Sequence, residues 1–149
     1  MISITCESDP DLIPPQSSIV KGIALQVLKD QRIKHGTISF IFASDDILLK
    51  LKLEFFKKDY FTDVITFSFN GCDKSFIEGE IYISLPRALE NSKIYNQSYE
   101  EEVSRLIIHG CLHLVGYNDK SEEEKKVMTK MEEEYLDKID FKRLFTSSG

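Results

Sequence analysis

Hydrophobic positions along the chain follow two periods, which predict alternating strands and helices. Residues 2–6, 37–43, 64–69 and 79–83 alternate or are rich in β-branched and aromatic side chains, as strands are. Apolar residues recur at helical spacing at 20–31. Further helices are expected after Ser44, after Ser84 and after two capping boxes, which begin at Ser98 and Ser121.

This order of elements predicts an α+β fold, or α/β sandwich, with a four-stranded mixed sheet packed by about five helices. The last two strands are expected to be antiparallel neighbours. The apolar face of the helix after Ser44 is expected to comprise Ile47, Leu48, Leu51 and Phe55.

Length and composition favour one globular domain over residues 1–149. The chain is 42% apolar and 30% charged and has no repeat or linker-like segment. No apolar run is long enough to span a membrane and the start is acidic, so a cytoplasmic protein without a membrane partner is expected. Three cysteines without CxxC spacing indicate neither a disulfide framework nor a thiolate zinc site.

Charge along the chain is unevenly distributed. The net charge of −6 disfavours broad, nonspecific attachment to nucleic acid, which depends on Lys and Arg displacing counterions. Acidic residues gather at 100–102 and 122–134, whereas the stretch from Lys50 to Lys58 holds four lysines. A local basic groove for a nucleic-acid substrate therefore remains compatible with the composition.

Residues 106–115, LIIHGCLHLV, are apolar nearly all round, which predicts a helix buried on most sides. His109 and His113 interrupt it four residues apart, so both imidazoles lie on one face, one turn apart. Buried imidazoles need partners, and a metal ion bound between them satisfies both. The sequence thus predicts a metal site on a buried central helix.

The histidine spacing alone is weak evidence, but the following residues strengthen it. Gly116 is expected to end the helix and let the chain fold back over the histidines. Asp119 is then the strong metal ligand in the returning segment. With a fourth position left for water, His109, His113 and Asp119 are typical of a catalytic zinc site, with one Zn²⁺ per chain expected. His35 lies in a polar turn and is expected to be an exposed bystander.

Zinc peptidases share this ligand geometry but differ at one position. Their HExxH motif places glutamate, as general base, after the first histidine. Gly110 occupies that position here, so a peptidase of this type is disfavoured.

Residues 109–120, HGCLHLVGYNDK, resemble the signature of the YbeY family, HGxLHLxGYDH. Two earlier segments agree in order and spacing: residues 59–68, DYFTDVITFS, are similar to the family's DxPTDVLSF, and residues 79–84, GEIYIS, to its GDIxIS strand. Met128, Met131 and Glu132 stand where the family has methionine and glutamate in its last helix.

The resemblance implies a bacterial, cytoplasmic, metal-dependent endoribonuclease that cleaves single-stranded RNA. It implies a role with ribosomal components in rRNA processing, notably maturation of the small-subunit RNA 3′ end, and in ribosome quality control. It also implies a zinc ion held by three residues of the signature.

The chain departs from the family pattern in two places. Asp119 replaces a third histidine, which keeps a zinc-competent ligand but adds an anion, and Asn118 replaces the preceding aspartate. The family's arginine ahead of the DxPTD segment falls at about Phe56 here. A lysine could supply the charge but not the bidentate fork of arginine. The candidates for this catalytic or RNA-binding charge are Lys52, Lys57, Lys58 and Arg87.

The leading hypothesis is phosphodiester cleavage at the metal, with lysines of the 50–58 segment holding the RNA backbone. Tyr60 and Phe61 could stack bases or simply pack beside the sheet. Thr62 and Asp63 could orient a ligand, and Asp63 could instead cap a turn.

Two other hypotheses stay open. One is a noncatalytic ribosome-assembly factor with a structural metal, which the missing arginine favours and the count of three protein ligands disfavours. The other is a metallohydrolase acting on another substrate.

Overall fold

The computed structural model describes residues 1–58, 62–70 and 76–145. Tyr60, Phe61 and Cys72 lie outside this part of the chain. The strands of the described residues are β1 (Ile2–Ser8), β2 (His35–Ala43), β3 (Val64–Ser68) and β4 (Phe76–Ser84). The helices are α1 (Ser17–Asp30), α2 (Asp45–Phe56), α3 (Leu85–Ile94), α4 (Tyr99–Leu114) and α5 (Glu122–Lys138).

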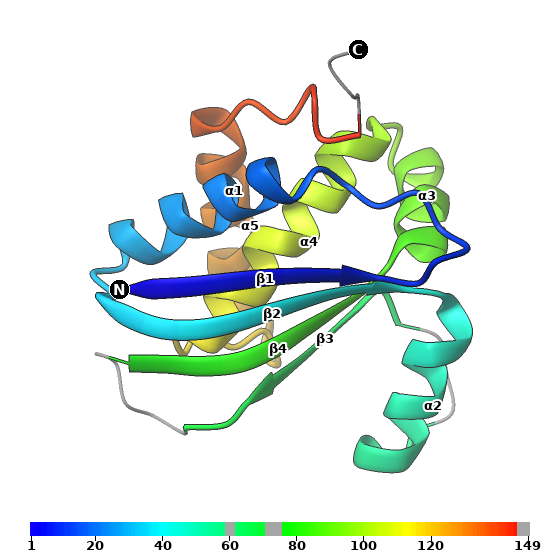
Figure 1. Cartoon of the computed structure of the whole chain (residues 1–149), viewed down its shortest axis with the longest axis horizontal. Helices are drawn as coiled ribbons and strands as arrows, with labels where there is room; N and C mark the ends of the chain where they lie inside the picture. Colours follow the sequence, from blue (N-terminus) through cyan, green and yellow to red (C-terminus); the bar gives the residue numbers. More distant parts are fainter. Residues whose placement is uncertain (59–61, 71–75, 146–149) are drawn as a thin grey trace.

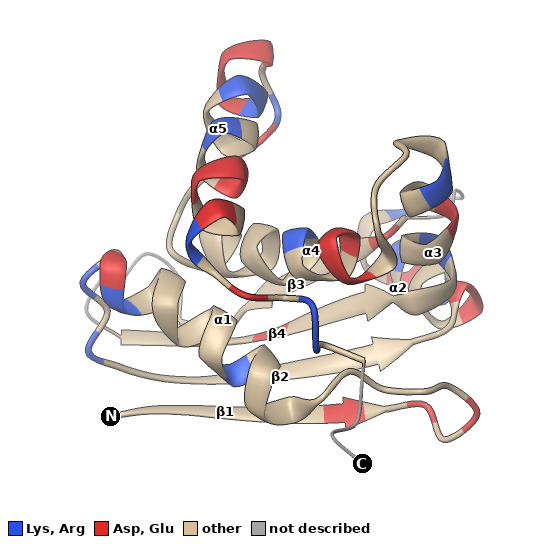
Figure 2. Ribbon diagram, turned by 90° about the horizontal axis from the view of Figure 1, so that it is seen from above, with Lys and Arg blue, Asp and Glu red and all other residues tan. Residues whose placement is uncertain are grey.

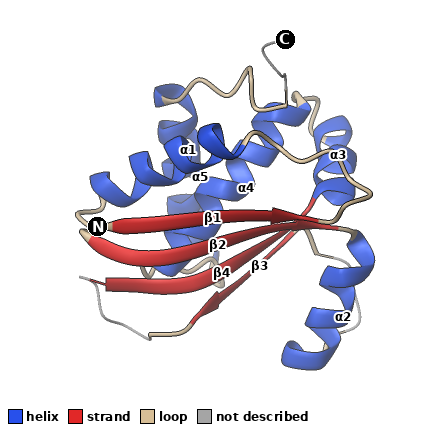
Figure 3. Cartoon of the chain, in the orientation of Figure 1, coloured by secondary structure: helices blue, strands red, loops and turns tan. Residues whose placement is uncertain are grey.

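The strands form one mixed sheet in the order β1-β2-β4-β3, as Figure 3 shows. β1 and β2 pair in parallel, as do β2 and β4, whereas β3 runs antiparallel to β4 with Val64 opposite Ile83. The predicted α+β fold, its mixed sheet and the antiparallel pairing of the last two strands are confirmed.

One face of the sheet carries the main hydrophobic core. Alternate residues of β2 and β4, such as Phe40 and Ile81, are fully buried against α1 and α4 (Figure 1). α4 lies among α1, α3 and α5 and packs against β3 and β4. The prediction that this helix is buried on most sides is confirmed.

The other face of the sheet is covered at one end by α2. Leu48 of α2 is buried with Ala43 and Ile65 in a second, small cluster. Ile47 and Phe55, which the helical pattern assigns to the same apolar face, are 41% and 57% exposed. The sheet therefore covers the predicted face only in part, although the ring of Phe55 contacts that of Phe67 on β3, with ring centroids 5.3 Å apart.

Serine side chains begin four of the five described helices. Backbone N–H groups donate to the hydroxyls of Ser44, Ser84, Ser98 and Ser121. Ser121 and Glu124 form the predicted capping box. The box predicted at Ser98 is half formed: the N–H of Glu101 donates to its hydroxyl, and the hydrogen bonds of the described chain do not include the reciprocal one.

Acidic residues fill the first turns of α4 and α5, and Figure 2 shows charges of both signs along α5. Negative charge at a helix N-terminus is favourable because the helix dipole is positive there. Within the ranges that the structure describes, every helix is too short or too polar to cross a membrane.

Candidate metal centre

The end of α4 delivers the predicted third ligand to the two histidines. Gly116 adopts a positive φ of 113°, and the N–H groups of Gly116 and Tyr117 donate to the carbonyls of His113 and Leu112. This is the Schellman arrangement, in which glycine relieves the strain of the left-handed conformation. The chain reverses there, and Asp119 returns to the face of α4 that carries His109 and His113.

The three side chains meet closely enough to hold one metal ion. The Nε2 atoms of His109 and His113 are 3.0 Å apart, and the Oδ2 atom of Asp119 lies 3.4 Å from the first and 3.5 Å from the second. Tetrahedral zinc with bond lengths near 2.0–2.1 Å separates its ligand atoms by roughly 3.3 Å. The donor set and its spacing therefore fit a tetrahedral ion with a position left open.

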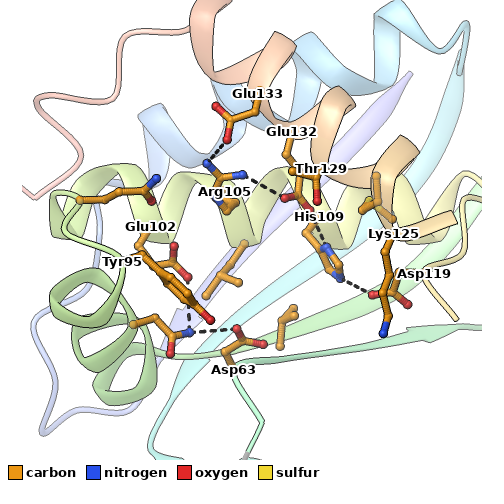
Figure 4. Close-up of a pocket in the computed structure, with 15 residues that line it drawn as sticks. Asp63, Tyr95, Glu102, Arg105, His109, Asp119, Lys125, Thr129, Glu132 and Glu133 are labelled. Atoms are coloured by element: carbon orange, nitrogen blue, oxygen red, sulfur yellow. Dashed lines mark hydrogen bonds and ion pairs between the residues drawn. The ribbon is translucent and has the colours of Figure 1, made fainter. Parts of the chain in front are cut away.

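A buried carboxylate on α5 fixes the orientation of His109. The Oε2 atom of Glu132 lies 2.7 Å from Nδ1 of His109, which directs Nε2 towards Asp119. Arg105 of α4 donates to Glu132 at 3.1 Å and to Glu133 at 2.6 Å, so the charge of Glu132 is itself compensated (Figure 4). Such carboxylate–histidine pairs set the tautomer and strengthen the imidazole as a ligand.

The two histidines differ in protonation behaviour. Burial disfavours charge on His109, but the hydrogen bond and charge of Glu132, with Asp119 and Asp63, raise its pKa above the ordinary value. Burial, followed by the neighbouring charge of His109, lowers the pKa of His113. Neutral His113 offers a lone pair to a metal at neutral pH.

Two cavities open on either side of the metal centre, and both include Asp63, Val64, His109 and Asp119 in their walls. The basic cavity, of about 600 Å³, also reaches His113. Its cationic and aromatic walls come from Lys52, Phe56, Lys58 and Lys120. The acidic cavity, of about 590 Å³, lies between α3, α4 and α5 (Figure 4). Its further polar lining includes Asn91, Tyr95, Glu102, Arg105, Glu132 and Glu133.

The four residues proposed to supply the charge of the missing arginine differ in their distance from the metal centre and its cavities. Lys52 and Lys58 line the basic cavity, and the ammonium of Lys52 lies 5.0 Å from the ring centre of Phe56. Lys57 ends α2 in a left-handed conformation and is outside both cavities. Arg87 is also outside them, and its guanidinium pairs with Asp45 at 2.9 Å.

Asp63, Thr62 and His35 make contacts away from the predicted metal ligands. The Asp63 carboxylate accepts a hydrogen bond from Asn91 at 3.0 Å, and none of its hydrogen bonds in the described chain reaches a histidine. Thr62 donates to the carbonyl of Val64 at 3.4 Å. His35 is exposed at the start of β2, with its Nδ1 2.7 Å from the N-terminal amine.

The sequence pattern predicted no role for four residues around the site: Asn91, Glu102, Arg105 and Glu132. One signal was available: the buried stripe of α5 is Met128, Glu132, Tyr135 and Leu136, so a glutamate occupies an otherwise apolar face. A charge on such a stripe indicates a buried partner.

Gly110, which excludes the peptidase motif, is required by helix–sheet packing. A Cβ atom there would lie 2.6 Å from Cγ2 and 2.9 Å from Cδ1 of fully buried Ile81 on β4. A glutamate side chain therefore has no room between α4 and the sheet.

We expect Gly110→Ala to lower the free energy of unfolding by about 1–2 kcal/mol, because overpacking exceeds the gain in helix propensity. Urea unfolding of the metal-free protein measures this. Gly22→Ala in α1 is the matched control, because a Cβ there meets nothing within 4 Å and should stabilise by up to about 1 kcal/mol. Equal shifts for the two variants would show that α4 does not press on Ile81.

Comparisons with known proteins agree with the motif resemblance. The model of the family described as endoribonuclease YbeY matches residues 6–140. The endoribonuclease YbeY of Christiangramia forsetii is 43% identical over 101 residues, covering 68% of this chain and 69% of the relative. That of Flavobacterium psychrophilum is 36% identical over 136 residues, covering 91% of this chain and 94% of the relative.

A solved structure has a similar fold. The solution structure of a Thermotoga maritima protein is similar with a TM-score of 0.63 and 28% sequence identity, covering 92% of this chain and 87% of that one. The family model covers residues 6–140, which include the α4 motif, and a relative with 36% sequence identity aligns over almost the whole chain. The chain therefore belongs to the YbeY family of endoribonucleases.

Proposed function

We propose that this protein is a zinc-dependent endoribonuclease that cleaves single-stranded RNA during rRNA processing, including maturation of the small-subunit RNA 3′ end and ribosome quality control. The observation that carries the proposal is the opening of the His109–His113–Asp119 cluster into a lysine-lined cavity. Relatives named endoribonuclease support the reaction class. We also propose that residues 1–149 form one domain and that the protein acts in the cytoplasm with ribosomal components.

The residues of the basic cavity divide the work of binding. Lys52, Lys58 and Lys120 bring positive charge beside the metal centre, where they can hold the phosphates flanking the reacting one. The ammonium of Lys52 lies 5.0 Å from the ring centre of Phe56, which stands at about the position of the family arginine. This supports Lys52 as a source of the missing charge, although without the bidentate fork of arginine. Phe56, 41% exposed, offers a ring on which a base can stack.

The residues of the metal centre position the reaction. His109, His113 and Asp119 would hold the ion, and Glu132 keeps the Nδ1 proton of His109 in place so that Nε2 carries the lone pair. When bound, zinc polarises a phosphoryl oxygen and lowers the pKa of a water molecule. The carboxylate of Asp119 makes the site less positive than three histidines would, which supports a less acidic water than in relatives with the third histidine.

The test is cleavage of a labelled single-stranded RNA by protein purified free of other nucleases, with and without a chelator. Cleavage that stops on chelation and returns with Zn²⁺ is expected. Duplex RNA of the same sequence should be cut far more slowly. Chelator-insensitive cleavage would contradict the proposed metal dependence.

A noncatalytic ribosome-assembly factor is the second candidate, and Phe56 in place of the family arginine favours it. The same assay separates the two functions. Metal-dependent RNA binding without any metal-dependent cleavage would select the assembly factor.

Loss of the cavity lysines should weaken RNA binding more than it slows the cleavage step. We expect Lys58→Ala and Lys120→Ala each to raise the KM for single-stranded RNA about 3- to 10-fold and to reduce the slope of log KM against log salt concentration. Lys29→Ala, a lysine of α1 outside the basic cavity, is the charge-matched control. A KM unchanged by both cavity variants would exclude this cavity as the RNA path.

A further inference from the structure

The acidic cavity is a second compartment that shares part of its wall with the basic cavity at the metal centre. It shares His109, Asp119 and Asp63 with the basic cavity, so a strand held by the lysines can pass a nucleotide into it beside the metal. Its apolar lining includes Leu106 and Met128. With about 590 Å³ it is large enough for a nucleoside.

The charge of this cavity excludes a phosphate. Its acidic lining residues are Asp63, Glu102, Asp119, Glu132 and Glu133. Of its two lysine or arginine residues, Arg105 is paired with Glu132 and Glu133, and the ammonium of Lys125 lies 3.9 Å from Glu122. Carboxylates therefore outnumber these cations, which disfavours a phosphate in the cavity. A neutral group rich in hydrogen-bond donors fits the same walls.

Two of these carboxylates are joined by one amide at the far end of the cavity. Asn91 Nδ2 donates to Asp63 at 3.0 Å and to Glu102 at 3.4 Å. Glu102 is only 3% exposed, and within the described chain the hydrogen bonding of its carboxyl group is limited to this single long contact. A buried carboxyl normally has more partners, so Glu102 retains capacity to accept a hydrogen bond from a ligand.

The position of Glu102 assigns it to recognition rather than to chemistry. It precedes His109 by seven residues on α4, which is roughly 10 Å along the helix axis. A group at that separation does not touch an atom reacting at the metal. It can meet the edge of a base whose phosphate lies at the metal.

Tyr95 gives the cavity an aromatic wall beside Glu102. It follows α3, is 64% exposed, and lies beside Glu102 in Figure 4, with Asp63 below and His109 farther along the cavity. An exposed tyrosine beside buried hydrogen-bond acceptors is the combination that stacks and reads an unpaired base.

Resting on the proposed RNA cleavage, we propose that the acidic cavity is a nucleobase subsite that selects a base with an exocyclic amino group next to the scissile phosphate. Glu102 and Asp63 accept from the amino group, and Tyr95 stacks on the ring. Adenine, cytosine and guanine carry such a group. Uracil does not, and its N3–H donor is flanked by two carbonyl oxygens, which the carboxyl oxygens repel. Burial raises the pKa of Glu102 to about 7, and both of its protonation states can still accept from an amino group.

The test is sequencing of the cut ends produced from a random single-stranded RNA pool by the zinc-loaded protein. We expect at least one position beside the cut to disfavour uracil about tenfold. Glu102→Gln introduces an amide donor that can pair with a uracil carbonyl. The bias against uracil at that position should therefore fall from about tenfold to about threefold or less. Glu90→Gln, the same change at an exposed position on α3 outside the cavity, should keep the wild-type preference.

Two results would overturn the subsite. One is wild-type cutting without regard to the neighbouring bases. The other is a Glu102→Gln variant that is slower at every site by one factor with an unchanged preference, because a purely structural role for Glu102 gives that result.

Binding of mononucleotides to the metal-free protein separates this inference from the proposed function. AMP, CMP and GMP should each bind more tightly than UMP, and Tyr95→Ala should weaken all four about 5- to 10-fold while keeping their order. Tyr95 is exposed, so its truncation leaves the core intact. Preferential binding without cleavage would reject the nuclease and keep the subsite, whereas cleavage with equal binding of all four nucleotides would reject the subsite alone.

Discussion

His113→Ala is expected to lose its metal ion on purification, while the wild-type protein retains close to one per chain. The variant leaves His109 and Asp119, two ligands where catalytic zinc sites use three. Loss of a group that merely orients a ligand costs about 10- to 100-fold in metal affinity, and loss of a ligand itself should cost more. Elemental analysis after dialysis measures this directly, and metal-dependent RNA cleavage should fall by at least about 100-fold.

Two further variants make this result interpretable. His35→Ala removes an exposed histidine at the start of β2 and should keep wild-type metal content. Glu132→Gln keeps all three ligands but changes the partner of His109 Nδ1, so it should bind zinc about 10- to 100-fold more weakly. Equal metal content in wild type and His113→Ala would refute the ligand assignment.

Glu102→Gln is expected to stabilise the metal-free protein at pH 8 by about 2–3 kcal/mol and to leave stability unchanged near pH 4. Burial raises the pKa of Glu102 from 4.5 to about 7. The hydrogen bond from Asn91 and the charge of Arg105 oppose this shift, and the charges of Asp63 and Glu132 add to it. The folded protein therefore holds a proton that the unfolded chain releases between these two values. Stability from this proton is complete below pH 4.5 and is lost as the pH rises through 7, whereas glutamine does not titrate.

Urea unfolding at several pH values, with a chelator present throughout, checks this prediction. Glu90→Gln serves again as control, because its exposed side chain should leave the pH dependence of unfolding unaltered. A difference between wild type and Glu102→Gln that is constant from pH 4 to pH 8 would show that folding does not shift the pKa of Glu102.

The geometry of the candidate metal centre was largely predictable because its information is local. The spacing of His109 and His113 fixes their shared face, and Gly116 specifies the turn that returns Asp119 within three residues. The alternation of side chains likewise predicted the four strands. These features depend on helix and strand geometry alone.

The acidic cavity could not be predicted in the same way. Asp63 precedes β3, Asn91 lies on α3 and Glu102 on α4, and only tertiary packing brings them into contact. Their environment also sets their charge: composition alone would count Glu102 as an ordinary surface anion in the acidic first turn of a helix. The exposure of Ile47 and Phe55 on α2 could not be predicted for a related reason. The helical period identifies an apolar face but not the part of the fold that covers it.

The contact between Gly110 and Ile81 sets a limit on how this scaffold could change function over evolutionary time. A single substitution to glutamate would complete the HExxH pattern, with both histidines already in place. The stem of that side chain would push α4 away from β4 and shift the imidazoles relative to Asp119. A path towards peptidase chemistry would thus need an earlier, smaller residue at position 81, and each intermediate along it would carry a void or a displaced metal site. The two motifs thus differ at one position, but a change from one to the other requires additional substitutions in the sheet.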